Sequence, residues 1–107
     1  MVQGLFSPKI NGGAVIASGT AAARATFAAT GTAAPNAGNA LSVVNGGTAT
    51  AFIDIETTGT GTAVATTSHA ILANAPPLVI PIPQGTVYLQ HVTSAGTATL
   101  YATRGNI

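Results

Sequence analysis

The feature that most constrains the fold is the run of turn residues Asn45, Gly46 and Gly47, which separates two apolar segments. Asparagine and glycine accept positive φ angles at low cost, and a tight hairpin turn requires such angles. After the turn, residues alternate with the period of two that is typical of a half-buried strand: Ala49, Ala51, Ile53 and Ile55 on the face predicted to be core, and Thr48, Thr50, Phe52, Asp54 and Glu56 on the other. Residues 41–56 are therefore predicted to form a β-hairpin.

The same pattern occurs again near the C-terminus. The sequence GTATLY at residues 96–101 repeats the GTATAF of residues 47–52, again after a short turn and an apolar segment. We predict a second hairpin from residues 87–92 and 97–103, followed by an exposed tail at residues 104–107.

The rest of the chain favours short strands. Glycine, proline and asparagine turn signals recur at roughly 8 to 12 residues, the spacing found in all-β domains. Further strands are predicted at residues 14–19, 21–29, 63–67 and 78–82, with a single helical turn capped by Ser68 at residues 68–74. The expected fold class is all-β, an antiparallel β-sandwich or a jelly-roll-like barrel, and the pattern gives no strand order.

The first residues differ from the rest of the chain. Leu5 and Phe6 form an isolated apolar pair before Pro8, and a turn follows at residues 11–13. We therefore expect residues 1–13 to be an extended N-terminal arm and residues 14–107 to be a single domain. Two interpretations of the arm stay open: Phe6 packs on its own domain, or the arm reaches a neighbouring subunit.

Prolines mark residues 78–82 as an edge strand. Leu78, Ile80 and Ile82 share one face, and Val79 and Pro81 share the other. Because proline has no backbone N–H, a strand that carries prolines cannot complete a ladder on both sides, which places it at the edge of a sheet.

Charge is very scarce in this sequence. Only 5% of the 107 residues are Asp, Glu, Lys or Arg, whereas ordinary soluble domains have about 25%. Alanine supplies 22 of the hydrophobic residues, so the core is thin, and 17 threonines and 13 glycines leave a nearly uncharged exterior. A net charge near zero promotes association, so we expect a homo-oligomer, a dimer or a trimer.

The same numbers argue against several classes of function. Three scattered basic residues give no electrostatic footprint for nucleic acid. No apolar run approaches the length of a membrane span, and residues 1–13 lack the features of a secretion signal, so we expect synthesis in the cytoplasm and no membrane partner. Without cysteine, neither a disulfide nor a cysteine-based zinc site can stabilise the chain.

Few residues suggest chemistry. Asp54 and Glu56 lie on one strand face about 7 Å apart, a separation that an inverting glycosidase could use, but a solvated or inter-subunit face is the favoured interpretation. His69 and His91 have no metal-ligand spacing, and the adjacency of Ser68 and His69 is not the spatial relation of a catalytic triad. We therefore expect neither an enzyme nor a cofactor.

Four stretches give the chain a resemblance to a known class: residues 41–52, 65–68, 80–85 and 96–105. They resemble small virion proteins of tailed bacteriophages, which include capsid decoration or cement proteins. The resemblance implies a structural protein on the capsid surface of the virion, bound to the major capsid protein. It also implies contacts through the arm and the edge strand, by backbone pairing or apolar packing; the interface residues predicted are Leu5, Phe6, Leu78, Val79, Ile80 and Ile82.

The alternative is a module of a phage fibre or tail tip that binds host-surface glycan. An exposed cluster of aromatic side chains would favour that function. Only Tyr88 and Tyr101 are candidates, and we expect them to pair across the last hairpin.

Overall fold

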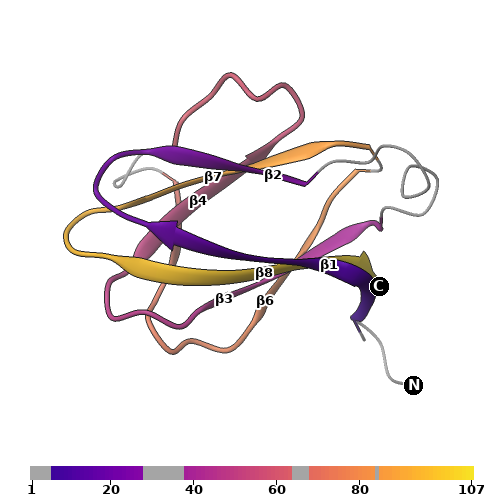
Figure 1. The fold of residues 1–107 in the computed structure, drawn as a ribbon, viewed down its shortest axis with the longest axis horizontal. Coiled ribbons are helices and arrows are strands. Elements are labelled where there is room, and N and C mark those ends of the chain that lie inside the picture. Colours follow the sequence, from indigo (N-terminus) through magenta and orange to yellow (C-terminus); the bar gives the residue numbers. More distant parts are fainter. Residues whose placement is uncertain (1–5, 28–37, 64–67, 84) are drawn as a thin grey trace.

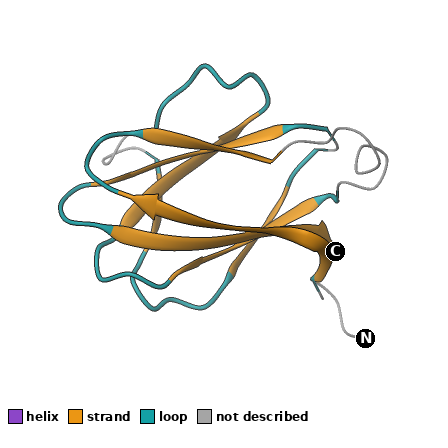
Figure 2. Ribbon diagram, viewed as in Figure 1, coloured by secondary structure: helices purple, strands orange, loops and turns teal. Residues whose placement is uncertain are grey.

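The computed structural model describes residues 6–27, 38–63, 68–83 and 85–107, and this part of the chain contains eight β-strands and no helix (Figure 2). The strands are β1 (Ser7–Ser18), β2 (Ala23–Phe27), β3 (Ala40–Asn45), β4 (Ala51–Glu56), β5 (His69–Ile71), β6 (Leu78–Pro81), β7 (Val87–Thr93) and β8 (Ala98–Asn106). The expectation of an all-β chain is confirmed.

The strands form two four-stranded sheets, with the orders β1-β8-β3-β6 and β2-β7-β4-β5 (Figure 1). Every pair of neighbouring strands is antiparallel. The pairs β1–β8, β2–β7, β3–β6 and β4–β5 describe a chain that doubles back on itself as one long ribbon. In the first sheet β3 also pairs with β8, and in the second β4 also pairs with β7, so each sheet holds two of these four pairs side by side.

Both sheets contribute to one core. Inward side chains alternate along β3 and β4 as the sequence predicted. The large apolar side chains that are fully buried are Leu41, Val43, Val87, Leu89 and Leu100, with Ile53 nearly so. Leu41, Val43 and Leu100 come from the first sheet, and Ile53 and Leu89 from the second.

The two predicted hairpins are wrong, because each pair of arms is divided between the sheets. β3 lies in the first sheet and β4 in the second, and β7 and β8 are divided in the same way. The two glycines are not required for a positive φ angle, because neither Gly46 nor Gly47 has one. A Cβ on Gly47 would lie 2.7 Å from the Cα of Ala98, so glycine is needed here for close approach of backbones.

Asn45 shapes the first of these sheet-to-sheet connections. Its side chain is fully buried, and Nδ2 donates to the carbonyl oxygens of Ala49 at 2.8 Å and Ile71 at 2.9 Å. Its Oδ1 accepts from the N–H of Gly47 at 3.0 Å. These bonds satisfy the buried amide and direct the chain out of the first sheet, so Asn45 is a core residue and not an exposed turn residue.

The sheet begins earlier than the predicted arm allows. β1 starts at Ser7 and pairs with β8 from Ser7 opposite Asn106 onward, with a register shift between Pro8 and Gly13. Residues 7–13 are therefore strand. Phe6 is half-buried, and Leu5 lies outside the described residues.

One smaller prediction is also wrong. Residues 69–71 form strand β5 where a helical turn was expected, and Leu72 is 61% exposed. The predicted strand at residues 63–67 lies almost wholly outside the described residues. The strand predicted within residues 21–29 is confirmed as β2, and residues 28–29 lie outside the described residues. The edge position of β6 is confirmed.

Arg104, expected in an exposed tail, is 4% exposed and binds three backbone carbonyl groups. Nη1 donates to Phe27 at 3.0 Å, Nη2 to Pro83 at 3.0 Å, and both Nη2 and Nε to Gly38 at 3.2 and 3.3 Å. Burial lowers the pKa of Arg104 from its ordinary value. The guanidinium thus connects the end of β2, the start of β3 and the chain after β6.

Candidate protein-binding groove

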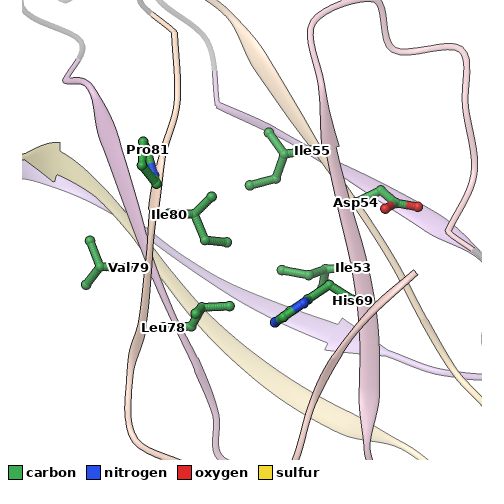
Figure 3. A pocket seen from close by; sticks show the side chains of 8 residues that line it. All are labelled: Ile53, Asp54, Ile55, His69, Leu78, Val79, Ile80 and Pro81. Atoms are coloured by element: carbon green, nitrogen blue, oxygen red, sulfur yellow. The ribbon is translucent and has the colours of Figure 1, made fainter. Parts of the chain in front are cut away.

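A groove of about 370 Å³ lies where the edge of the first sheet faces the second sheet (Figure 3). Its walls come from β6 on one side and from β4 and β5 on the other. The residues that line it are Ile53, Asp54, Ile55, His69, Leu78, Val79, Ile80 and Pro81. We call this feature the edge groove.

The interior of the edge groove is apolar. Leu78 and Ile80 point from β6 toward Ile53 and Ile55 on β4, as Figure 3 shows. Leu78, Ile80 and Ile55 are partly exposed and pack against the core, so the groove is a continuation of the core that opens to solvent. An apolar side chain inserted here would gain about 25 cal/mol for each Å² of apolar surface removed from water.

Two polar residues lie at the rim. The ring of His69 points toward Leu78, whereas Asp54 points to the opposite face of β4 (Figure 3). The carboxylate of Asp54 accepts a hydrogen bond from the hydroxyl of Ser68. His69 begins β5, within the segment where a helical turn was expected.

The outer edge of β6 is blocked by proline. Ile82 N–H donates to the carbonyl of Asn39 at 2.8 Å, continuing the register that places Ile80 opposite Leu41. Because backbone groups of alternate residues point to the same neighbour, those of Val79 and Pro81 point away from β3. Proline has no N–H, so Val79 supplies the single outward N–H of β6. This edge disfavours backbone pairing with another strand and leaves apolar packing as its means of contact.

The residues predicted to form the interface lie in two different surroundings. Leu78, Val79 and Ile80 line the edge groove. Ile82 is 6% exposed and belongs to the core, so it is not available to a partner. Ile53, Ile55 and His69 were not predicted to lie here, because they come from the second sheet and the sequence gives no strand order.

The two carboxylates considered for catalysis lie in different surroundings. Glu56 Oε1 accepts from the N–H of Gly61 and from Nε2 of Gln90, both at 2.7 Å. Arg24 donates to the carbonyl of Gly61 at 3.1 Å. Together these bonds hold the connection after β4 over the outer face of the second sheet, so Glu56 has a structural role there.

The two histidines flank Ile53 in one row of the second sheet, His69 on β5 and His91 on β7. Two strand spacings separate their Cα atoms by about 9.6 Å, with Ile53 between them. His91 is 3% exposed, and its Nδ1 lies 2.9 Å from the hydroxyl of Ser18. Burial lowers the pKa of His91.

The described ranges contain neither a cluster of metal ligands nor a membrane-spanning helix. No group of three or more His, Asp or Glu side chains could hold a metal ion among these residues. None of the described segments is a helix long and apolar enough to cross a membrane.

Comparisons with protein-family models, with curated proteins and with solved structures found no match for the chain.

Proposed function

We propose that the chain is a structural assembly protein that binds another protein through the edge groove. The observation that carries the proposal is an open apolar groove beside a strand edge where Pro81 opposes backbone pairing. Such a site fits an apolar anchor from a partner, which would complete the core that the two sheets leave open.

We further propose that the two sheets form an eight-stranded jelly roll. The pairing of β1 with β8, β2 with β7, β3 with β6 and β4 with β5 supports this fold, because a jelly roll is a long antiparallel ribbon rolled into two sheets. Jelly rolls are frequent in viral capsid and lectin domains. That frequency is an analogy between folds and raises the likelihood of both functions considered for this chain.

The specific function that we propose is decoration of a tailed-phage head, with the major capsid protein as partner. The resemblance of residues 41–52 and 96–105 to virion proteins supports it, as does the near absence of charge. A protein that covers a lattice needs flat, neutral surfaces, and the chain has a formal net charge of +1.

The glycan-binding alternative lacks clustered aromatic side chains in the described residues. Tyr88 and Tyr101 lie in different sheets, so they are not the cross-strand pair expected of them. A Cβ on Gly59 would lie 3.1 to 3.2 Å from ring atoms of Tyr88, so that ring lies under the connection after β4. Tyr101 is 49% exposed on the first sheet.

The test is cryo-electron microscopy of purified particles of the phage that carries this gene. We expect ordered copies over the head with the edge groove against the capsid protein. A few copies at a fibre or tail tip would favour glycan recognition, and absence from particles would contradict both functions.

A matched pair of variants tests the edge groove itself. Leu78→Asn introduces a polar group into the groove and should reduce the occupancy of heads. Leu72→Asn makes the same change at an exposed position that does not line the groove, and should leave occupancy unchanged. Thermal melts of both variants would show whether any loss of binding reflects loss of the fold.

A further inference from the structure

The two edges of the first sheet differ in chemistry. β6, at one edge, is blocked by proline, whereas β1, at the other, pairs in the described part of the chain with β8 alone. Residues 13–18 of β1 contain neither proline nor a charged residue. Their N–H and C=O groups alternate in direction, so half of them point away from β8. An edge of this kind is a template for another strand.

The side chains of this edge are small and largely exposed. Gly13, Ala14 and Ala17 are exposed, and Val15 is 71% exposed. Val15 lies opposite Tyr101, which lies opposite Val44 on β3, so an apolar row crosses the outer face of the sheet and ends at this edge. This apolar row reaches the free edge of the sheet, and none of the described residues covers Val15 there.

We propose that β1 pairs with β1 of a second copy of the chain, antiparallel and around a two-fold axis. Residues opposite each other in an antiparallel pair point to the same face of the sheet. Val15 points outward and Ile16 inward, so the registers compatible with both faces place like against like. The register that buries most exposed apolar surface sets Val15 against Val15 of the second copy, with Ala17 against Gly13 and Ile16 against Ala14.

A second copy fits this edge for an electrostatic reason. A two-fold interface brings each residue close to its own equivalent, so a charged residue near the axis would meet a like charge. Residues 13–18 carry no charge and avoid this repulsion. The edges of the second sheet are poorer candidates, because β2 has five residues and includes Arg24, and β5 has three.

The dimer would leave both edge grooves open. β1 and β6 are opposite edges of the same sheet, so pairing through β1 forms a continuous sheet of eight strands with a β6 at each end. Such a dimer would present two grooves and could bind a repeating lattice at two points, which strengthens binding without any new contact. The pairing itself does not depend on what the groove binds.

A single cysteine tests the register. The chain has no cysteine, and directly opposed residues of an antiparallel pair have Cα atoms about 4.5 to 5.5 Å apart, within the range of a disulfide. Full-length Val15→Cys should therefore form a covalent dimer under mild oxidation. Leu72→Cys, which is exposed and distant from β1 in sequence and sheet, should give only background cross-linking.

Sedimentation of the unmodified chain and of Val15→Lys tests the association. We expect a dimer for the former and a monomer for the latter, with unchanged circular dichroism, because Val15 contributes little to its own core. A monomer at high concentration in the unmodified chain, a dimer that persists in Val15→Lys, or equal cross-linking of the two cysteine variants would each overturn the proposal. Should Val15→Lys fail to fold, the cysteine comparison decides alone.

Discussion

The backbone N–H of Gly46 donates a 2.8 Å hydrogen bond to the carbonyl oxygen of Thr99. This bond joins the β3–β4 connection to the start of β8. The two repeated segments, residues 47–52 and 96–101, therefore belong to two sheet-to-sheet connections that lie side by side. On the other side of the contact, a Cβ on Gly96 would lie 3.7 Å from the Cβ of Ala49. Each repeat supplies a glycine where the other connection approaches.

A first prediction concerns the close approach at Gly47. A Cβ there would lie 2.7 Å from both the Cα of Ala98 and the backbone nitrogen of Thr99, so Gly47→Ala forces backbone to move. Overpacking of this kind costs about 1 to 3 kcal/mol, which urea denaturation can measure. Gly19→Ala is the control, because no atom lies within 4 Å of its added Cβ. Equal stability of the two variants would contradict the packing of the two connections.

The local pattern of the chain was predictable, and the pairing of strands was not. Alternation identified the inward residues of β4 and β7, because side-chain direction in a strand is a local property. Asn45, Gly46 and Gly47 suit a hairpin and a sheet-to-sheet connection alike, so turn chemistry alone could not choose the partner of β4. Pro81 did place β6 at an edge, because a missing N–H acts directly on the ladder.

The role of Arg104 could not be predicted, for a related reason. Its partners are the backbone carbonyls of Phe27, Gly38 and Pro83, which every residue type possesses. No acidic residue near it in the sequence could have indicated a pair. The edge groove was half predictable in the same sense: β6 was found from its own residues, and the wall formed by β4 required the strand order.

A second prediction concerns this buried arginine. Arg104→Met keeps the apolar stem and leaves three carbonyl groups without their donor, which should lower the free energy of unfolding by about 2 to 4 kcal/mol. Arg24→Met removes a single exposed hydrogen bond and should cost less than about 1 kcal/mol. Thermal or urea denaturation of the two variants measures the difference. A loss as small for Arg104 as for Arg24 would show that the carbonyl groups find other donors.

A third prediction concerns pH. Because burial lowers the pKa of His91 in the folded chain below its ordinary 6.5, the unfolded chain binds more protons between these two values. The stability associated with neutral His91 is fully present above pH 6.5 and decreases as the pH falls toward the folded pKa. The slope cannot exceed about 1.4 kcal/mol per pH unit for one proton.

The measurement is a series of urea denaturations across this pH range. His91→Gln has no titrating group at the position and can still bond to the hydroxyl of Ser18, so the slope should flatten in this variant. A slope that is unchanged by the substitution would assign the pH dependence to another group.

A fourth prediction concerns the blocked edge. Pro81→Ala gives β6 a second outward N–H without altering its bonds to β3, since the nitrogen of residue 81 points away from β3. The stability of the single chain should therefore change by less than about 1 kcal/mol, whereas association through the edge should increase, because outward donors allow a second strand to pair. Sedimentation velocity over a range of concentrations measures the association.

Pro76→Ala is the matched control for this edge. Pro76 is exposed and precedes β6, so its replacement removes a surface proline without adding a donor to the strand. If both variants associate equally, the effect belongs to the general loss of proline and not to the direction of the N–H at position 81. If Pro81→Ala alone associates, Pro81 is what keeps β6 from pairing, and the edge groove beside β6 binds partners through side chains.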